Sequence, residues 1–230
     1  MIISLHTPKA AGSSFKKLLE KEFSHSLISD YKDKPFNKNV ERRIEDVKFK
    51  RRKLKYFYKL YYKCIGIECI HGHFLPYGYD IYLNNPDTKF ITWLRDPLQR
   101  LASNYFYWFR AYNKNKSGDL HKKVVEENWS FEKFAFSEEM KNFYNQFLYK
   151  FPIENFDFIG LTEFFEDDLK YFSEKYLNKK ITHVPITNIN INKTREYYDD
   201  PILIKELKEF HSVDYSIYNF AIQKRNNRFK

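Results

Sequence analysis

The first 23 residues constrain the fold most, because they join a short apolar run to an amphipathic segment through a tight polar loop. Residues 2–6 predict a buried strand, and residues 12–23 predict a helix whose apolar side chains share one stripe: Phe15, Leu18, Leu19 and Phe23. Backbone N–H groups at the start of such a helix can bind an anion. The chain therefore opens as an α/β protein with a candidate phosphate-binding loop.

The alternation of strands and helices continues along the chain. Residues 67–71, 89–94 and 156–160 are short apolar runs that predict further strands of an interior parallel sheet. Residues 24–39 and 112–121 predict surface loops. Helices are predicted at residues 40–63, 97–108, 122–127, 131–136, 139–148, 163–177, 202–210 and 214–225. We expect a P-loop-like α/β fold of three layers, in which helices flank a central, mostly parallel sheet, with helical insertions.

Length and cysteine content limit the class of protein. At 230 residues and 43% hydrophobic, residues 1–230 fit a single domain, with 24–63 and 112–148 as insertions. Cys64 and Cys69 have no neighbouring Cys or His cluster, so they are expected to be reduced, buried thiols rather than zinc ligands or a disulfide framework. We see no apolar stretch long enough for a signal peptide or membrane span, and so expect a cytoplasmic location.

The charge balance favours anionic partners. Forty Lys and Arg residues against 30 Asp and Glu give a formal net charge of +10. Basic and aromatic residues alternate between Arg42 and Lys63. Such a segment is most often a solvated helix face, but it would also suit an acidic glycan or single-stranded nucleic acid.

The loop after the first strand differs from the common ATPase loop. In that loop, GxxxxGK[ST], the lysine follows the last glycine, whereas Lys9 precedes Gly12 here. A lysine on the early limb can reach a bridging oxygen of a bound phosphate group, while Gly12, Ser13 and Ser14 donate from the helix start. The simpler alternative is an ordinary strand-to-helix turn with a solvated lysine.

A second candidate phosphate site follows the strand at residues 89–94. Arg95 leaves the strand end, and Ser103 lies two turns into the next predicted helix. Both can face one phosphate at the carboxyl edge of the sheet, where open α/β folds bind ligands. Alternatively, Arg95 and Asp96 form an ion pair at the helix start, which explains neither Ser103 nor the first loop.

Together these motifs resemble those of a known family. Two segments are similar to the 5′- and 3′-phosphate motifs of carbohydrate sulfotransferases that use 3′-phosphoadenosine 5′-phosphosulfate (PAPS). The segments are Pro8-Lys9-x-x-Gly12-Ser13-Ser14 and Arg95-Asp96-Pro97-x-x-Arg100-x-x-Ser103-x-Tyr105. His71-Gly72-His73 between them makes the heparan sulfate 2-O-sulfotransferase branch the nearest likeness. Residues 158–163, 192–195 and 213–218 add weaker similarities. The family's eukaryotic members carry a membrane anchor and lumenal disulfides, so we expect a soluble, bacterial-type form here.

The resemblance implies roles for individual residues. A neutral histidine is the usual base near pH 7, so His73 would take the proton of the acceptor hydroxyl, with His71 as its partner or alternative. Lys9 would neutralise the leaving phosphate, whose oxygens would be held by the loop residues Ala10, Ala11, Gly12, Ser13 and Ser14. Arg95 and Ser103 would hold the 3′-phosphate. Lys193, Thr194 and Arg195 either close over the donor or form a solvated basic loop. No metal is expected.

The resemblance thus implies an O-sulfotransferase that moves a sulfuryl group from PAPS to an acceptor hydroxyl. The best class of acceptor is an oligo- or polysaccharide, with the two insertions shaping its site. One alternative is a P-loop-type kinase or hydrolase with a degenerate loop, which needs magnesium held by Ser13 and a strand-end aspartate. A second is a noncatalytic nucleic-acid-binding protein, which would leave both phosphate motifs unexplained. We therefore expect no nucleic acid partner.

Overall fold

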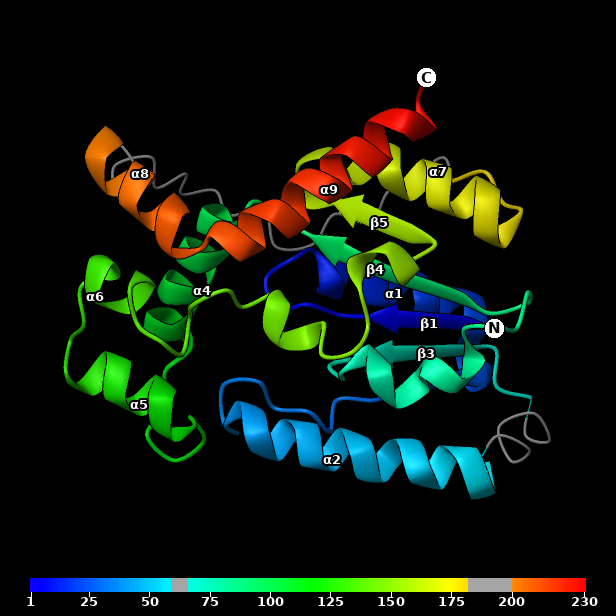
Figure 1. Cartoon of the computed structure of the whole chain (residues 1–230), viewed down its shortest axis with the longest axis horizontal. Helices are drawn as coiled ribbons and strands as arrows, with labels where there is room; N and C mark the ends of the chain where they lie inside the picture. Colours follow the sequence, from blue (N-terminus) through cyan, green and yellow to red (C-terminus); the bar gives the residue numbers. More distant parts are fainter. Residues whose placement is uncertain (59–65, 182–199) are drawn as a thin grey trace.

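A parallel β-sheet forms the centre of the molecule (Figure 1). The computed structural model describes residues 1–58, 66–181 and 200–230. In these residues the sheet has five strands in the order β2-β3-β1-β4-β5, and every neighbouring pair is parallel. The strands are β1 (Ile2–Leu5), β2 (Leu27–Ser29), β3 (Cys69–Gly72), β4 (Lys89–Leu94) and β5 (Phe158–Leu161). The predicted α/β fold is confirmed.

Helices cover both faces of this sheet. The α-helices are α1 (Gly12–Phe23), α2 (Val40–Lys53), α4 (Pro97–Ala111), α5 (Asp119–Glu126), α6 (Phe131–Ala135), α7 (Phe165–Leu177), α8 (Pro201–Phe210) and α9 (Ser212–Arg228). Phe15 of α1 and Phe172 of α7 pack with Trp93 on one face. Ile217 of α9 packs on the other face, where Phe147 and Tyr79 extend the core. A third apolar cluster joins α4, α5, α6 and α8 beyond the carboxyl ends of the strands (Figure 1).

The strand order places the chain's loops where a ligand can bind. β1 is central, with β3 on one side and β4 on the other. The chain passes from β1 to β2 at one edge of the sheet, and later from β3 across β1 to β4, so the direction in which strands are added reverses at β1. Open α/β sheets bind ligands in the crevice at such a switch point, outside the carboxyl ends of the strands. The loops after β3, β1 and β4 all open there.

Two predictions of local structure were wrong. Residues 24–39, predicted as a loop, contain β2, whose Ile28 aligns with Ile70 of β3. A strand of three residues is too short to show periodicity, and its pairing with β3 defines it. Residues 139–148 have helical spacing of apolar side chains but form turns around a short 3-10 helix, Asn145–Phe147. Asn142 has a left-handed φ of 46°. Beyond it, the N–H groups of Tyr144 and Asn145 donate to Asp214 of α9 instead of completing a helix.

Other predictions are refined. α2 ends at Lys53 and continues as a π-helical turn, Leu54–Tyr58, whereas the remainder of the helix predicted to residue 63 lies outside the described residues. α5 begins at Asp119, inside the predicted loop 112–121. Cys69 is a free, buried thiol, as expected, and Cys64 lies outside the described residues. Among the helices in the described part of the chain, none has the length and apolar character needed to cross a bilayer.

Candidate functional site

The loop between β1 and α1 is held in a fixed, strained shape. The Thr7 hydroxyl donates to the Trp93 carbonyl at 2.6 Å, which ties the loop to β4. Lys9 and Ala11 have left-handed φ values of 68° and 55°. Left-handed residues in such a turn point successive backbone N–H groups into one concavity, which suits an anion. Ala11 is the N-cap of α1 and its side chain makes no capping hydrogen bond, while the Ser14 N–H donates to the Ala11 carbonyl at 3.1 Å. The predicted phosphate loop therefore has the geometry of an anion cradle.

Gly12 is required by a close approach of His6. A Cβ atom on Gly12 would lie 1.7 Å from Nε2 and 1.9 Å from Cδ2 of the His6 ring. The imidazole thus forms the floor beneath the start of α1. His6 was not assigned to a site from the sequence. The sequence did contain a signal for it: Ile2, Ser4 and His6 are every second residue of β1 and the position after it, so their side chains point to the same face.

A cavity of about 970 Å³ opens beside this loop. It brings together most of the residues that the sequence assigned to a site: Lys9, Ala11, Gly12, Ser13, Ser14, His73, Arg95 and Ser103. Ala10 and His71 do not line the cavity and are buried behind it. Lys193, Thr194 and Arg195 lie outside the described residues.

Lys9 projects into a positively charged part of this cavity. Its Nζ lies 3.9 Å from the centroid of the Tyr107 ring. Burial, together with the nearby guanidinium groups of Arg110 and Arg95, lowers the pKa of Lys9 to about 8. Both arginines also line the cavity. Three cations around one space repel one another unless an anion lies between them, so this part of the cavity is suited to a phosphate group.

Arg95 is positioned through its backbone. The Arg95 N–H donates to the Tyr144 hydroxyl at 3.0 Å, and that hydroxyl donates to the Arg95 carbonyl at 2.7 Å. Asp96 accepts from the N–H of Gln99 as the N-cap of α4. Within the described part of the chain, Arg95 and Asp96 form no ion pair, so the guanidinium is available to the cavity. Ser103 lies on the cavity side of α4, on the face that also presents Tyr107 and Arg110.

Three histidines and a tyrosine form a cluster at the carboxyl ends of β1 and β3. His71 is 1% exposed and its Nδ1 lies 2.8 Å from the Ser4 hydroxyl oxygen. The His6 ring stacks on His71 with centroids 5.3 Å apart and lies 4.7 Å from the His73 centroid. The Tyr31 hydroxyl lies 2.9 Å from His6 Nδ1. Burial is the main cause that lowers the pKa of His71 to about 3 and of His73 to about 4, so both rings are neutral near pH 7.

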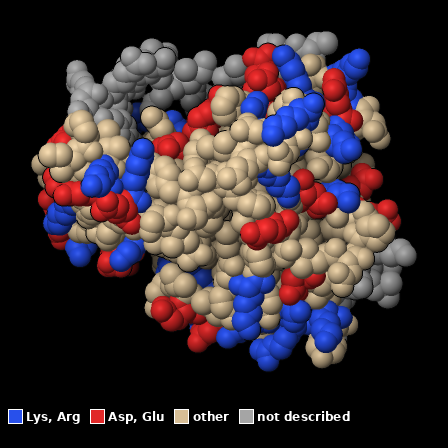
Figure 2. All heavy atoms as spheres, turned by 45° about the horizontal axis from the view of Figure 1, so that its top comes forward, with Lys and Arg blue, Asp and Glu red and all other residues tan. Residues whose placement is uncertain are grey.

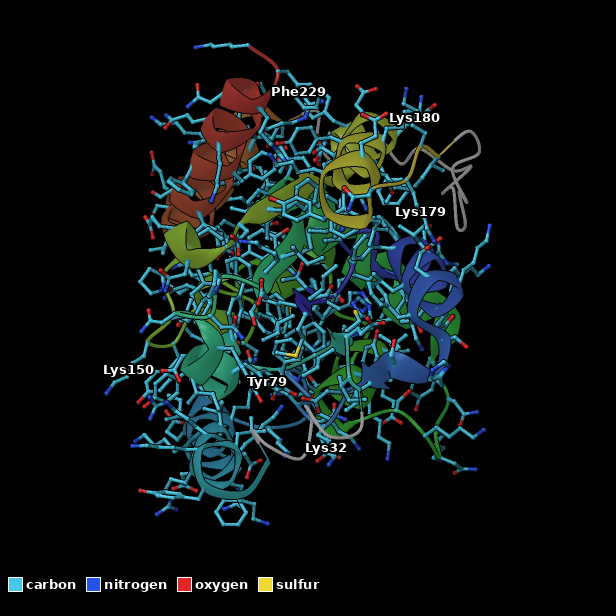
Figure 3. All side chains as sticks on the ribbon, turned by 90° about the vertical axis from the view of Figure 1, so that its right-hand side faces the viewer. Lys32, Tyr79, Lys150, Lys179, Lys180 and Phe229 are labelled. Carbon is cyan, nitrogen blue, oxygen red and sulfur yellow. The ribbon has the colours of Figure 1, made fainter. Side chains whose placement is uncertain are left out.

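The segment between β2 and α2 forms another wall of the cavity. The Asp30 carbonyl approaches Gly72 so closely that a Cβ there would lie 1.9 Å from its oxygen. The Asp30 carboxylate accepts from the Tyr79 hydroxyl at 2.8 Å and pairs with Lys50 of α2. Tyr79 lies in the interior of the molecule, between the sheet and α2 (Figure 3). This wall is therefore anchored to α2.

Further pairs fix the same wall. Arg43 of α2, whose side chain is fully buried, donates from Nε and Nη2 to Asp33 at 2.8–3.1 Å. Phe36 stacks on Phe143 with centroids 4.8 Å apart. The basic segment is thus more than a solvated face, because several of its cations hold acidic partners. The remaining described cations of this segment are exposed: Lys48, Arg52, Lys53 and Lys55. On the face in Figure 2, positive and negative side chains intermingle around a broad neutral area rather than separating into one basic patch.

The acidic content of the site bears on its chemistry. Within the described part of the chain, no group of three or more His, Cys, Asp or Glu side chains is arranged to hold a metal ion. Asp33 is the acidic residue among the described residues that line the cavity, and Arg43 occupies its carboxylate. A magnesium-dependent kinase would need an unpaired aspartate at a strand end. Among the described residues, the two aspartates that follow strands near the cavity are both engaged: Asp30 pairs with Lys50, and Asp96 caps α4.

Comparison with known proteins gives a likeness to a solved structure. No family model matches the chain, and no curated protein matches it. Among solved structures, a sulfotransferase from Alicyclobacillus acidocaldarius is similar over 96% of this chain and 95% of its own, with a TM-score of 0.49 and 15% sequence identity. We draw no conclusion about activity from a likeness at this level.

Proposed function

We propose that the protein is a PAPS-dependent O-sulfotransferase that acts on a saccharide hydroxyl. One observation carries the proposal: Lys9, His73 and Arg95 leave three adjacent strands and line one cavity at the switch point of the sheet. A donor with both a 5′-phosphosulfate and a 3′-phosphate needs two anion sites beside a base. Lys9 with the start of α1 would form one of these sites and Arg95 with Ser103 the other, and His73 lines the same cavity.

The residues fit the donor's two anionic ends. Lys9 and the N–H groups of Gly12 and Ser13 would hold the 5′-phosphate at the start of α1. Arg95 and the Ser103 hydroxyl would hold the 3′-phosphate, which distinguishes this donor from ATP. The donor supplies an activated sulfuryl group whose leaving group is a phosphate. A shape fixed by Thr7 and by the packing of Gly12 on His6 needs no rearrangement to receive it.

The chain's residues then supply positioning and charge stabilisation. The acceptor oxygen forms a bond to sulfur as the bond between sulfur and the 5′-phosphate oxygen breaks. Lys9, protonated at pH 7, stabilises the negative charge that develops on this phosphate oxygen. The acceptor's proton passes to the neutral imidazole of His73. Atoms and charge balance with no further reactant.

His73 is a better base than His71. His73 lines the cavity, whereas His71 is buried behind it with its Nδ1 engaged by Ser4. We therefore assign proton transfer to His73 and packing of the cluster to His71. Tyr31, Phe36, Tyr107 and Trp108 also line the cavity, and aromatic side chains are suited to contact the apolar face of a sugar ring.

The rival functions fit this site less well. A magnesium-dependent kinase would need an unpaired carboxylate near Ser13, but Asp33 is held by Arg43. A nucleic-acid-binding role for α2 gives no reason for Lys9 and Arg95 to face one cavity. Donor binding separates the three proposals.

Thermal unfolding with 3′-phosphoadenosine 5′-phosphate (PAP), ADP and AMP, each without magnesium, tests the proposal. A ligand at 100 times its Kd stabilises the native state by about 2.7 kcal/mol. We expect the largest rise in Tm with PAP and its loss in Lys9→Ala. Equal shifts with all three nucleotides, or a shift that needs magnesium, would contradict the assignment. His73→Ala should retain the response to PAP and lose transfer of sulfur-35 from labelled PAPS to an oligosaccharide mixture.

A further inference from the structure

The chain after β2 runs alongside the end of β3 toward His73. Ser29 aligns with His71 in the parallel register, and the next residue, Asp30, lies against Gly72. The Tyr31 ring then lies 4.8 Å from the His73 ring in an edge-to-face arrangement. Asp33 follows two residues later and lines the same cavity as His73. The path of the backbone thus carries a carboxylate to the neighbourhood of the proposed base.

Arg43 fixes this carboxylate. Its guanidinium donates to both Asp33 oxygens, with Nε at 2.9 and 3.1 Å and Nη2 at 2.8 Å. The Asp33 side chain is 10% exposed, and that of Arg43 is not exposed. Arg43 also lies 4.7 Å from the Phe147 centroid and donates to the Gln146 side chain at 3.3 Å. A forked pair with packing on both sides leaves Asp33 one orientation.

Charged and titratable groups face His73 from each packed element. His6 and His71, at the ends of β1 and β3, are neutral near pH 7 and repel a proton on His73 when charged. Arg43 of α2 disfavours the imidazolium, and Asp33 favours it more strongly. Tyr31 contributes a ring edge and an un-ionised hydroxyl, because burial raises its pKa to about 12. Asp33 is thus the anion beside His73 within the described residues.

We propose that Asp33, held by Arg43, is a positioning residue that stabilises the His73 imidazolium during proton transfer. This inference rests on the proposed function. The acceptor's proton moves to His73 and stays there until it leaves to solvent, while Asp33 remains ionised and Arg43 keeps its own proton. A buried imidazole surrounded by two others is a poor proton acceptor, and a fixed carboxylate offsets that deficit.

Asp33 and Arg43 have opposite effects on the pKa of His73. Asp33→Asn removes the anion, so it lowers the pKa of His73. Arg43→Gln removes the opposing cation, so it raises that pKa. We expect kcat for sulfuryl transfer to fall at least about tenfold in Asp33→Asn, since one pKa unit of lost stabilisation corresponds to tenfold. PAP affinity should change less than about twofold, because Asp33 belongs to neither proposed phosphate site and its carboxylate is bonded to Arg43.

Nuclear magnetic resonance of the His73 ring in the full-length protein measures both effects between about pH 3 and 8, a range that contains the His73 pKa of about 4. Asp80→Asn is the matched control, because Asp80 pairs with Arg51 of the same helix at 2.6 Å and does not line the cavity. It should leave the His73 titration and kcat as in the wild type. If Arg43→Gln does not fold, Arg43→Lys serves in its place: it keeps the positive charge, so the pKa of His73 should stay as in the wild type.

Unchanged titration and unchanged kcat in Asp33→Asn would overturn the inference. So would equal losses in Asp80→Asn and Asp33→Asn, because these would show a general effect of weakening α2. The ring titration requires no donor. A protein that fails to bind PAP but shows opposite pKa shifts in the two variants would therefore refute the proposed function while leaving the coupling of Asp33 to His73 in place.

Discussion

Gly12→Ala is the most informative single substitution, because the structure fixes its magnitude. The added Cβ would lie 1.7 Å from His6 Nε2, and ordinary contact begins at 3.4 Å, so the ring and the helix start must separate by about 1.7 Å. His6 cannot recede freely, since His71 and His73 lie behind it. Overpacking of this kind costs about 1–3 kcal/mol, which outweighs the roughly 1 kcal/mol that alanine gains over glycine in a helix.

The larger effect is on donor binding. A displacement of this size would break the hydrogen bonds from the Gly12 and Ser13 N–H groups to the phosphate, and a hydrogen bond to a charged group is worth about 1.5–3 kcal/mol. We therefore expect PAP affinity, measured by calorimetry, to fall by about two orders of magnitude in Gly12→Ala. The free energy of unfolding, measured in urea, should fall by roughly 1–2 kcal/mol. Wild-type PAP affinity together with an unchanged urea midpoint would show that the helix start does not rest on His6.

A double mutant isolates the cause. His6→Ala removes the ring that obstructs the new methyl group, so His6→Ala/Gly12→Ala should recover stability relative to Gly12→Ala, with a coupling of about 1–3 kcal/mol. Ala11→Gly is the adjacent control. It relieves a left-handed φ of 55° without adding an atom, so it should stabilise the protein by about 1 kcal/mol. Additive effects of the His6 and Gly12 substitutions would refute the steric explanation.

Three further predictions test the charges and hydrogen bonds of the site. PAP affinity should fall as the pH rises through about 8, where Lys9 loses its proton, and Lys9→Arg should remove this dependence, as calorimetry at pH 7 and 9 would show. Ser103→Ala should weaken PAP by about tenfold through the loss of one hydrogen bond to a charged group while leaving AMP affinity unchanged, and an equal loss for both would contradict a 3′-phosphate site. The urea midpoint should fall as the pH drops from 6.5 toward 4, because burial lowers the pKa of four histidines, His6, His71, His73 and His211, and the unfolded chain then binds protons that the native state does not. Each histidine contributes at most about 1.4 kcal/mol per pH unit. Asp214 acts in the opposite direction, because burial raises its pKa to about 6.

The local elements of the site follow from short stretches of sequence. The apolar run at residues 2–6, the order of Lys9 and Gly12, and the helical stripe of residues 12–23 all lie within one short stretch, so local propensity and chain geometry specify them. The same holds for Asp96 and Pro97, which start α4 in the structure as a capping residue and a first-turn proline. Periodicity likewise identified β3, β4 and β5 to within two residues at each end.

Which side chains share the cavity depends on how these elements pack together. β2 exists because β3 pairs with it, and residues 139–148 are not a helix because Asp214, about 70 residues later, accepts their N–H groups. His6 joins the site through the parallel pairing of β1 with β3, and His73, which follows the last paired residue of β3, lines the cavity while His71 does not. The Asp33–Arg43 pair depends on α2 packing against the wall that follows β2. Each of these contacts forms only when separate elements pack against one another, so the periodicity of a single element does not reveal it.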